Sequence, residues 1–181
     1  RQLEQYYRLG KARNFEEWRA AMAMQALPSI NYVYADREGN IAYFYNAKLP
    51  LRAEGYDWQG VLPGDRSETV WTEYLPFASL PQVVNPASGF VVNSNHTPFR
   101  ATVGADNPDP ADFPESFGIE TDMTNRGLRA LELFGADDSI TAEEFRRYKF
   151  DKRYSVESHA ARIRDEVLAA ELPDDPLLAE A

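Results

Sequence analysis

The clearest alternation of apolar and polar positions lies between residues 31 and 45. The segments Asn31 to Ala35 and Ile41 to Tyr45 are rich in β-branched and aromatic residues. Between them, residues Asp36 to Asn40 form a polar stretch that contains Gly39. Two apolar runs joined by a short glycine-containing segment are typical of a β-hairpin, which we therefore predict here.

Helical spacing of apolar residues appears first near the start of the chain. A helix is predicted from about Phe15 to Gln25, with Asn14 as its N-cap and Glu17 three residues further on, as in a capping box. Pro28 limits its extension. The chain also begins, at Arg1, within a segment of helical character, which we interpret as the cut edge of a larger protein.

The last third of the chain is predicted to be helical. One helix takes in Asn125 to Phe134 and stops at Gly135. Thr141 and Glu144 form a capping box that begins another. A third runs from Ser155 towards Leu172 and is closed by Pro173, with these residues on its inner edge: Val156, Ile163, Val167 and Ala170 or Glu171.

A long irregular stretch from Asn46 to Pro86 separates the hairpin from the next apolar run. It is rich in proline and glycine, yet it also carries large aromatic side chains, which linkers rarely do. These aromatic residues are Trp58, Trp71, Tyr74 and Phe77. We expect the stretch to pack over a partner surface.

Composition narrows the classes of function. The 181 residues are 44% hydrophobic, which suits a packed domain, and the formal net charge of -10 disfavours binding to nucleic acid. The absence of cysteine excludes thiol catalysis and Cys-ligated zinc, and two histidines are too few for a His-rich metal site. Neither a targeting signal nor a membrane-spanning apolar run is visible.

The segment NPASGFVVNSNHTPF, from Asn85 to Phe99, carries the most specific chemistry. A short strand is predicted from Gly89 to Ser94, so that Asn93 and Asn95 lie on the same side of an extended backbone. An Asn held at the end of a buried strand can donate its side-chain N–H to an oxyanion. The alternative is that both residues cap turns, a common role of Asn.

The pattern NPxSGFxxNxNxTPF resembles the equivalent segment in the large chain of the penicillin acylase family. Further similar segments follow in the family's order, and they cover nearly the whole chain: Gln25 to Phe44, Leu49 to Arg52, Trp71 to Pro86, Met123 to Phe134 and Ile140 to Phe145. The resemblance implies an α+β fold, as a fragment of the four-layer αββα sandwich of the N-terminal-nucleophile hydrolases. Residues 1–134 would then belong to the acylase domain, and residues 135–181 would be a helical segment of the same large chain.

The resemblance also implies the reaction. The family hydrolyses linear amides in penicillins, acyl-homoserine lactones and acylated cyclic peptides, and the NSNHTPF form is most similar to the latter two types. The nucleophile would be an N-terminal Ser outside this chain, and the internal serines lack a base, so the isolated chain is expected to be inactive. Its partners would be the acylated substrate, the small chain and the rest of the large chain, in the periplasm or outside the cell.

Two site residues follow from matching the family's motif. Asn95 corresponds to the Asn whose side chain donates to the tetrahedral intermediate. Arg126 corresponds to an Arg near the active site that supports the surroundings of the nucleophile; the alternative is a helix-first-turn Arg that pairs with Asp122 or Glu120.

Two other residues are weaker candidates. His96 adjoins Asn95 but should point away from it in an extended segment, and the family uses the free α-amino group of its nucleophile as base, so we expect His96 to be a surface or loop-packing residue. Glu115 is near the position of a family calcium ligand, although a calcium site needs six or more oxygens. The resemblance implies that catalysis requires no cofactor and that any calcium would be structural.

The sequence is also compatible with a non-catalytic protein. The chain could be a secreted, acidic binding module that uses the aromatic stretch from Trp58 to Phe77 to hold a ligand or a protein. The reading frame upstream of Arg1 would distinguish the two, because an acylase requires a processing site followed by a hydrophobic strand there.

Overall fold

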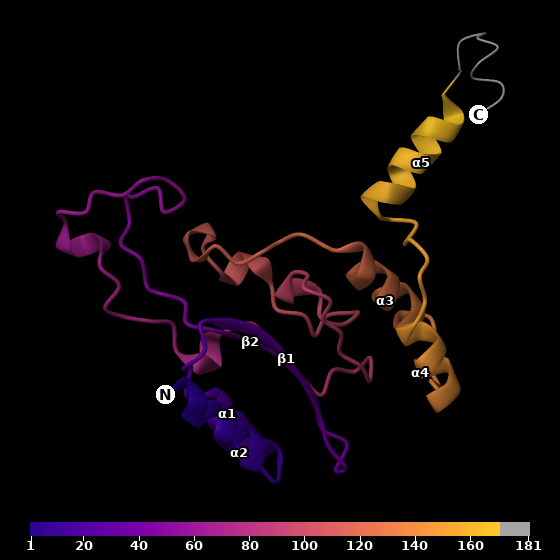
Figure 1. The fold of residues 1–181 in the computed structure, drawn as a ribbon, viewed down its shortest axis with the longest axis horizontal. Helices are drawn as coiled ribbons and strands as arrows, with labels where there is room; N and C mark the ends of the chain where they lie inside the picture. The colour runs from indigo at the N-terminus through magenta and orange to yellow at the C-terminus, as the bar shows by residue number, and fades with distance from the viewer. Residues whose placement is uncertain (171–181) are drawn as a thin grey trace. The chain divides into compact units, whose positions relative to one another are not determined.

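A computed structural model describes residues 1–170 of the chain (Figure 1). The chain divides into two compact units, one of residues 1–123 and one that begins at residue 124. The predicted end of the last helix, at Leu172 and Pro173, and the inner-edge position Glu171 lie outside the described residues.

The first unit combines two helices with a three-stranded antiparallel sheet. Its strands are in the order β1-β2-β3, so β2 is central. The elements are α1 (Gln2–Lys11), α2 (Phe15–Met22), β1 (Ser29–Ala35), β2 (Ile41–Ala47) and β3 (Gln82–Val84). The remainder of this unit consists of loops and short 3-10 turns.

The predicted hairpin is confirmed and extends further than the alternation indicated. In the register of β1 and β2, Val33 is opposite Tyr43 and Ser29 is opposite Ala47. The carboxylate of Asp36 closes the turn by accepting the backbone N–H of Asn40 at 2.8 Å. Gly39 supplies the turn with a φ of +88°, a conformation that costs other residues strain.

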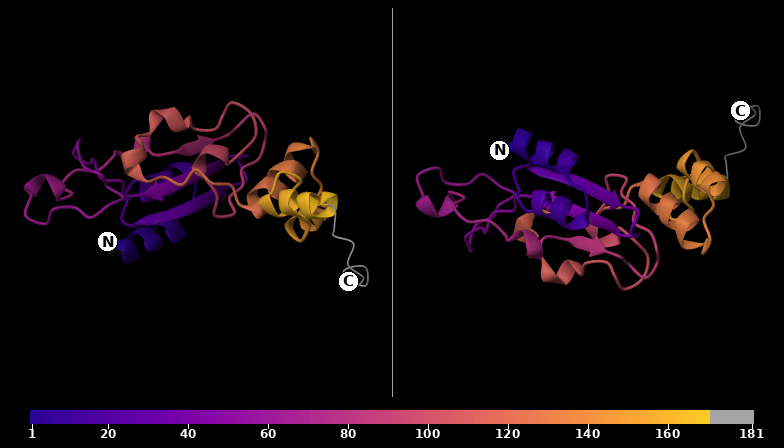
Figure 2. Two further views of the ribbon diagram at one scale, coloured as in Figure 1. Left: turned by 90° about the horizontal axis from the view of Figure 1, so that it is seen from above. Right: turned by 90° about the horizontal axis from the view of Figure 1, so that it is seen from below.

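Strand β2 is buried on both faces. On one face, Ala42 and Phe44 pack with side chains from α1 and α2. On the other, Tyr43 and Tyr45 lie in a cluster that includes Leu80, which precedes β3, and residues of the segments that come after β3, among them Ala101. Figure 2 shows the two helices on one side of the sheet and these segments on the other. A strand covered on both faces explains why Ile41–Ala47 is almost continuously apolar.

Helix α2 begins where the sequence predicts and ends earlier. The side chain of Asn14 accepts the backbone N–H of Glu17 at 2.9 Å, which confirms the N-cap. The helix stops at Met22, and the chain then passes through Gln25, whose φ of +41° is incompatible with continued helix. The predicted extension to Gln25 is therefore wrong.

A buried amide side chain fixes α1 to the rest of the unit. Gln5 donates to the side-chain oxygen of Asn46 at 3.2 Å and to the carbonyl of Met22 at 3.4 Å. Its own oxygen accepts the backbone N–H of Ala26 at 2.8 Å. Asn46 in turn donates to the carbonyl of Met22 at 3.0 Å, so this network joins α1, β2 and the turn after α2.

The aromatic residues between Asn46 and Pro86 are covered more fully than the sequence indicates. Phe77 stacks on Phe44 with ring centroids 5.5 Å apart. Trp58 is partly buried and donates its indole N–H to the carbonyl of Ala53 at 2.9 Å. Trp71 remains 50% exposed. The expectation that this stretch packs over a partner surface is therefore not needed to cover Phe77, which lies against β2, and only part of the Trp58 side chain is left exposed.

The second unit consists of helices and connecting segments. Each helix starts at a side-chain cap, and Thr141 and Glu144 form the predicted capping box. The helices are α3 (Asn125–Gly135), α4 (Ala142–Lys149) and α5 (His159–Ala169). Within residues 1–170, none of the helices is both long and apolar enough to cross a membrane.

The predicted inner edge of the last helix is exposed. Ile163 and Val167 on α5 are 60% and 63% exposed, and Val156, which precedes the helix, is 76% exposed. Ala161 is the buried residue of α5. The predicted helix is present, but its predicted start at Ser155 is wrong, because Ser158 caps the helix and α5 begins at His159. Periodicity also does not predict what covers the helix, because an apolar helical stripe does not specify its partner.

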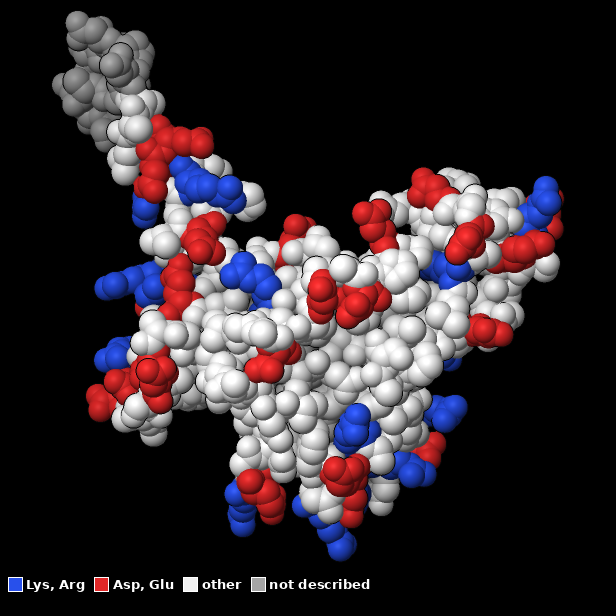
Figure 3. Space-filling model, turned by 180° about the vertical axis from the view of Figure 1, so that it is seen from behind, with Lys and Arg blue, Asp and Glu red and all other residues white. Residues whose placement is uncertain are grey.

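Charged side chains of both signs are distributed over the surface. On the face drawn in Figure 3, Lys and Arg side chains are interspersed among Asp and Glu and do not form a continuous basic stripe.

Candidate active-site loop

Residues 92–101 form a closed loop, and not the continuation of a strand. The backbone N–H of Val92 donates to the carbonyl of Ala101 at 2.8 Å, which joins the two ends of the loop. Val91 packs against the cluster on β2, and Ala101 is buried within that cluster. The predicted strand from Gly89 to Ser94 is wrong, because no residue of that segment has strand structure.

A tyrosine in the same cluster makes a polar contact. Tyr45 donates its hydroxyl to the carboxylate of Glu120 at 3.0 Å. Burial, together with this carboxylate, raises the pKa of Tyr45 to about 12. The Tyr45 hydroxyl therefore stays protonated at neutral pH. Its hydrogen bond to Glu120 holds the cluster against which the loop packs.

Asn93 caps a turn, as the alternative interpretation of the sequence proposed. Its side-chain oxygen accepts the backbone N–H of Asn95 at 3.1 Å, and its amide donates to the carbonyl of His96 at 3.3 Å. Such bonds compete with strand pairing, since they offer the backbone a local partner. The backbone at Asn93 and Asn95 is consequently turned and not extended, contrary to the prediction.

Asn95 is exposed within this loop. Its φ is +58°, in the left-handed region that Asn tolerates better than most residues. A non-glycine residue held at positive φ is uncommon and often marks a functional position. The loop therefore presents the predicted oxyanion donor at the surface of the unit.

His96 is fully buried, which confirms loop packing and excludes the surface alternative. Its ring Nδ1 lies 3.1 Å from the backbone nitrogen of Ser94, and its Nε2 lies 3.0 Å from the carbonyl oxygen of Arg100. The sequence did not indicate these two hydrogen bonds of the imidazole ring. A usable signal was the position of His96 between the N-x-N pair and Pro98, inside a turn.

The other predicted site residues lie elsewhere. Arg126 is exposed in the first turn of α3, in the second unit, whereas Asn95 belongs to the first. Glu115 is exposed in a short 3-10 turn. Among residues 1–170 there is no group of three or more His, Cys, Asp or Glu side chains placed to hold a metal ion.

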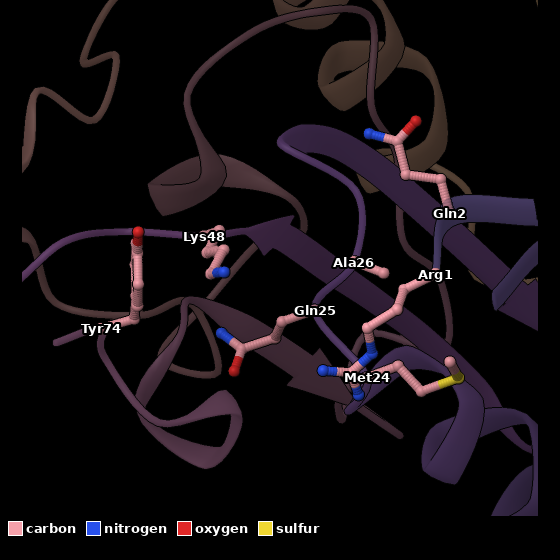
Figure 4. A pocket seen from close by; sticks show the side chains of 7 residues that line it. All are labelled: Arg1, Gln2, Met24, Gln25, Ala26, Lys48 and Tyr74. Atoms are coloured by element: carbon pink, nitrogen blue, oxygen red, sulfur yellow. The ribbon is translucent and has the colours of Figure 1, made fainter. Parts of the chain in front are cut away.

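The first unit also contains a cavity of about 350 Å³ (Figure 4). Gln25 lies in its lining with the strained φ of +41°, and its amide donates to the carbonyls of Ala47 and Leu75. The Lys48 ammonium is 4.1 Å from the ring centroid of Tyr74. The lining residues are Arg1, Gln2, Met24, Gln25, Ala26, Lys48 and Tyr74, so Asn95 does not line this cavity.

Comparison with known proteins identifies the family. The combination of helices with an antiparallel sheet is consistent with the α+β fold that the resemblance to the acylases implied. A family model described as penicillin amidase matches residues 1–179. The chain therefore belongs to the penicillin amidase family.

Individual relatives agree with this assignment. Penicillin G acylase from Escherichia coli is 42% identical over 88 residues, which cover 49% of this chain and 10% of that protein. Penicillin acylase 2 proenzyme from Pseudomonas sp. (strain SE83) is 29% identical over 156 residues, or 72% of this chain and 20% of that protein.

A solved structure supports the fold. The thermostable penicillin G acylase from Alcaligenes faecalis superposes with a TM-score of 0.69 and 28% sequence identity, over 96% of this chain and 29% of that one. The predicted fold class, an α+β fragment of the penicillin acylase fold, is confirmed. The chain spans a fifth or less of the length of the curated relatives it matches.

Proposed function

We propose that residues 1–181 are a segment of the large chain of an amidohydrolase, and that Asn95 supplies one donor of its oxyanion hole. The observation that carries the proposal is the loop of residues 92–101. It is closed at its base and holds Asn95 exposed at positive φ, in a chain that the penicillin amidase model matches over nearly its full length.

The chemistry assigned to Asn95 is electrostatic. When a nucleophile adds to an amide carbonyl, negative charge develops on the oxygen, and a positioned N–H donor stabilises that charge more than it stabilises the substrate. The amide side chain of Asn is neutral and does not titrate near neutral pH, so its N–H donors are always present. The nucleophile and its base come from outside these 181 residues, as an N-terminal Ser with its free α-amino group.

Roles are also proposed for Arg126 and Glu115, and for segments of the protein outside these 181 residues. Arg126 contributes positive potential near the nucleophile, and the chain assembles with the small chain and the remainder of the large chain. The name proenzyme of one relative supports such processing. The substrates are amides of the penicillin, acyl-homoserine lactone or acylated cyclic peptide classes, and the enzyme acts in the periplasm or outside the cell. Calcium, bound through Glu115, is structural.

The test replaces Asn95 in the longer protein that contains this chain. Asn95→Ala and Asn95→Gly should each lower kcat by about 100-fold to 1000-fold, the usual effect of losing one oxyanion donor, with little change in KM. Asn95→Asp should be at least as damaging, because it places a negative charge where one develops. Near-normal turnover in these variants would remove Asn95 from the mechanism.

Asn85 provides a matched control. Like Asn95 it is exposed and adopts a positive φ, of +48°, but it caps the start of β2, where its side chain accepts the N–H of Ile41 at 2.8 Å. Asn85→Ala imposes the same kind of backbone strain and should leave kcat unchanged. Asn95→Gly removes the amide without backbone strain, because glycine adopts a positive φ readily. Asn85→Ala therefore measures the effect of strain alone, and Asn95→Gly measures the effect of losing the donor alone.

A further inference from the structure

His96 is placed to control the conformation of the candidate active-site loop. It is one of two histidines in the chain, and it is fully buried. A buried polar side chain is tolerated when its hydrogen-bonding groups are satisfied, and both ring nitrogens lie within hydrogen-bonding distance of backbone atoms of the loop.

The two contacts determine the protonation state of the ring. The partner of Nδ1 is the backbone N–H of Ser94, which can only donate, so Nδ1 accepts and carries no proton. The partner of Nε2 is the carbonyl of Arg100, which can only accept, so Nε2 carries the proton and donates it. The ring is therefore neutral, in the Nε2–H form.

These contacts bracket Asn95. The imidazole holds the N–H of Ser94, the residue before Asn95, and the carbonyl of Arg100, five residues after it. The backbone carbonyl of His96 itself accepts from the amide of Asn93, whose oxygen holds the N–H of Asn95. Two side chains thus fix the backbone on both sides of the residue with positive φ.

We propose that His96 is a positioning residue, whose neutral imidazole fixes the turn that aims the side chain of Asn95 at the developing oxyanion. The inference rests on the proposed function of Asn95. His96 does not act as a base in it, because each of its ring nitrogens is engaged with the backbone. Its effect on the reaction is transmitted through the placement of the Asn95 amide, to which catalysis is sensitive on a scale of about 1 Å.

The experiment measures kcat and KM of variants in the longer, processed protein. His96→Leu fills the buried space without hydrogen-bonding groups and should lower kcat by about 10-fold to 100-fold while KM changes little. His96→Asn keeps an acceptor for the Ser94 N–H and should recover part of the lost kcat. The control is His159→Leu, at the exposed first residue of α5, which should retain normal kcat.

A double-mutant cycle distinguishes positioning from a general loss of structure. If His96 acts through Asn95, adding His96→Leu to Asn95→Gly should lower kcat no further. If the two losses multiply, His96 supports the fold or the reaction by another route, and the inference is wrong. Normal kcat in His96→Leu would also overturn it, even where Asn95→Gly is impaired. Normal kcat in Asn95→Gly, by contrast, would refute the proposed function itself.

A spectroscopic measurement remains decisive if His96→Leu does not fold. Nitrogen-15 NMR of the unmodified protein should show His96 with an unprotonated Nδ1 and a protonated Nε2 at neutral pH, the form that the two backbone partners require. Resonances of the opposite tautomer, or of an imidazolium, would show that the ring does not hold the Ser94 N–H and would overturn the inference.

Discussion

Arg129 of α3 holds Asp151 through two hydrogen bonds, from Nε to Oδ1 at 2.9 Å and from Nη2 to Oδ2 at 3.3 Å. The same guanidinium donates through Nη1 to Glu132 at 2.9 Å. The side chains of Arg129 and Asp151 are only 21% and 17% exposed. A two-point contact of this kind, shielded from solvent, is stronger and more directional than an ordinary surface ion pair.

Glu132 links this ion pair to the segment that leads into α5. Its Oε1 accepts the hydroxyl of Ser155 and the backbone N–H of Val156, the latter at 3.2 Å. The side-chain oxygen of Asn125 accepts the N–H of Ser155 at 2.8 Å. Polar contacts therefore attach residues 151–156 to α3.

Removing the guanidinium should release this segment. We expect Arg129→Met to lower the local free energy of unfolding by about 2 kcal/mol, because it leaves two carboxylates partly buried without their cation. Amide hydrogen exchange at Ser155 and Val156 should then speed up about 30-fold. Arg129→Lys keeps the charge but not the two-point contact, so its exchange rates at these amides should lie between those of the unsubstituted protein and of Arg129→Met. Unchanged exchange in Arg129→Met would contradict the prediction.

The same contacts predict a dependence on pH. The hydrogen bonds from Arg129 hold the pKa of Asp151 below its ordinary value of 3.8. For Glu132, burial acts to raise the pKa, but the bonds from Ser155 and Arg129 outweigh it and lower the pKa below 4.5. A carboxylate whose pKa is lower in the folded state stabilises that state above its unfolded pKa.

That stabilisation should therefore be fully present above about pH 5 and be lost progressively as the pH falls below 4. Protection factors of the Ser155 and Val156 amides, corrected for intrinsic exchange, should decline over this range. In Arg129→Met the decline should be smaller, since the cation that lowers both pKa values is absent. An equal decline in both proteins would show that other groups control it.

Arg52 should stabilise the irregular stretch after β2. Its guanidinium carbon lies 5.4 Å from the ring centroids of both Trp58 and Trp71, and its Nη1 donates to the carbonyl of Ser116. Arg52→Leu should weaken this contact by about 1–2 kcal/mol, which corresponds to roughly 5-fold to 30-fold faster limited proteolysis between residues 53 and 70. Arg52→Lys should retain part of the protection; equal cleavage rates would contradict the role of Arg52.

The isolated 181-residue polypeptide should be inactive on amide substrates and should associate or be marginally stable. Its described surface includes exposed apolar side chains in both units, among them Val61, Val70 and Trp71 in the first and Ile163 and Leu168 in the second. Such surface favours contact with the remaining segments of its parent protein or with itself. Sedimentation and thermal unfolding test this.

A monomer with a sharp cooperative melt and no affinity for those segments would indicate a self-sufficient domain, and would favour the binding-module alternative. Amide hydrolysis by the purified chain would contradict the assignment of the nucleophile to another part of the protein.

Local sequence predicted the parts of the fold whose partners are local. The hairpin of β1 and β2 and the capping box at Thr141 depend on residues within a few positions of each other. The strand predicted from Gly89 to Ser94 failed because the apolar run is short and the side chains of Asn93 and His96 hold the backbone in a turn.

The sequence also does not predict which surface packs against α5, and the reason is different. Its exposed stripe of Ile163 and Val167 has helical spacing, but spacing carries no information on the surface that the stripe meets. For the candidate site, the resemblance predicts Asn95 as the oxyanion donor. The role proposed for His96 depends on which backbone atoms face its ring nitrogens, which the sequence does not show.

The buried amide of Gln5 determines the position of α1 along its axis. Leu3 and Tyr7 of this helix are exposed, and Gln5 is its fully buried residue. If α1 moved along its axis by one turn, about 5.4 Å, the side chains of Gln5 and Asn46 and the backbone N–H of Ala26 would lose these hydrogen bonds. The network thus selects a single register for α1. Replacing Gln5 with leucine would leave the helix attached but free to occupy several positions.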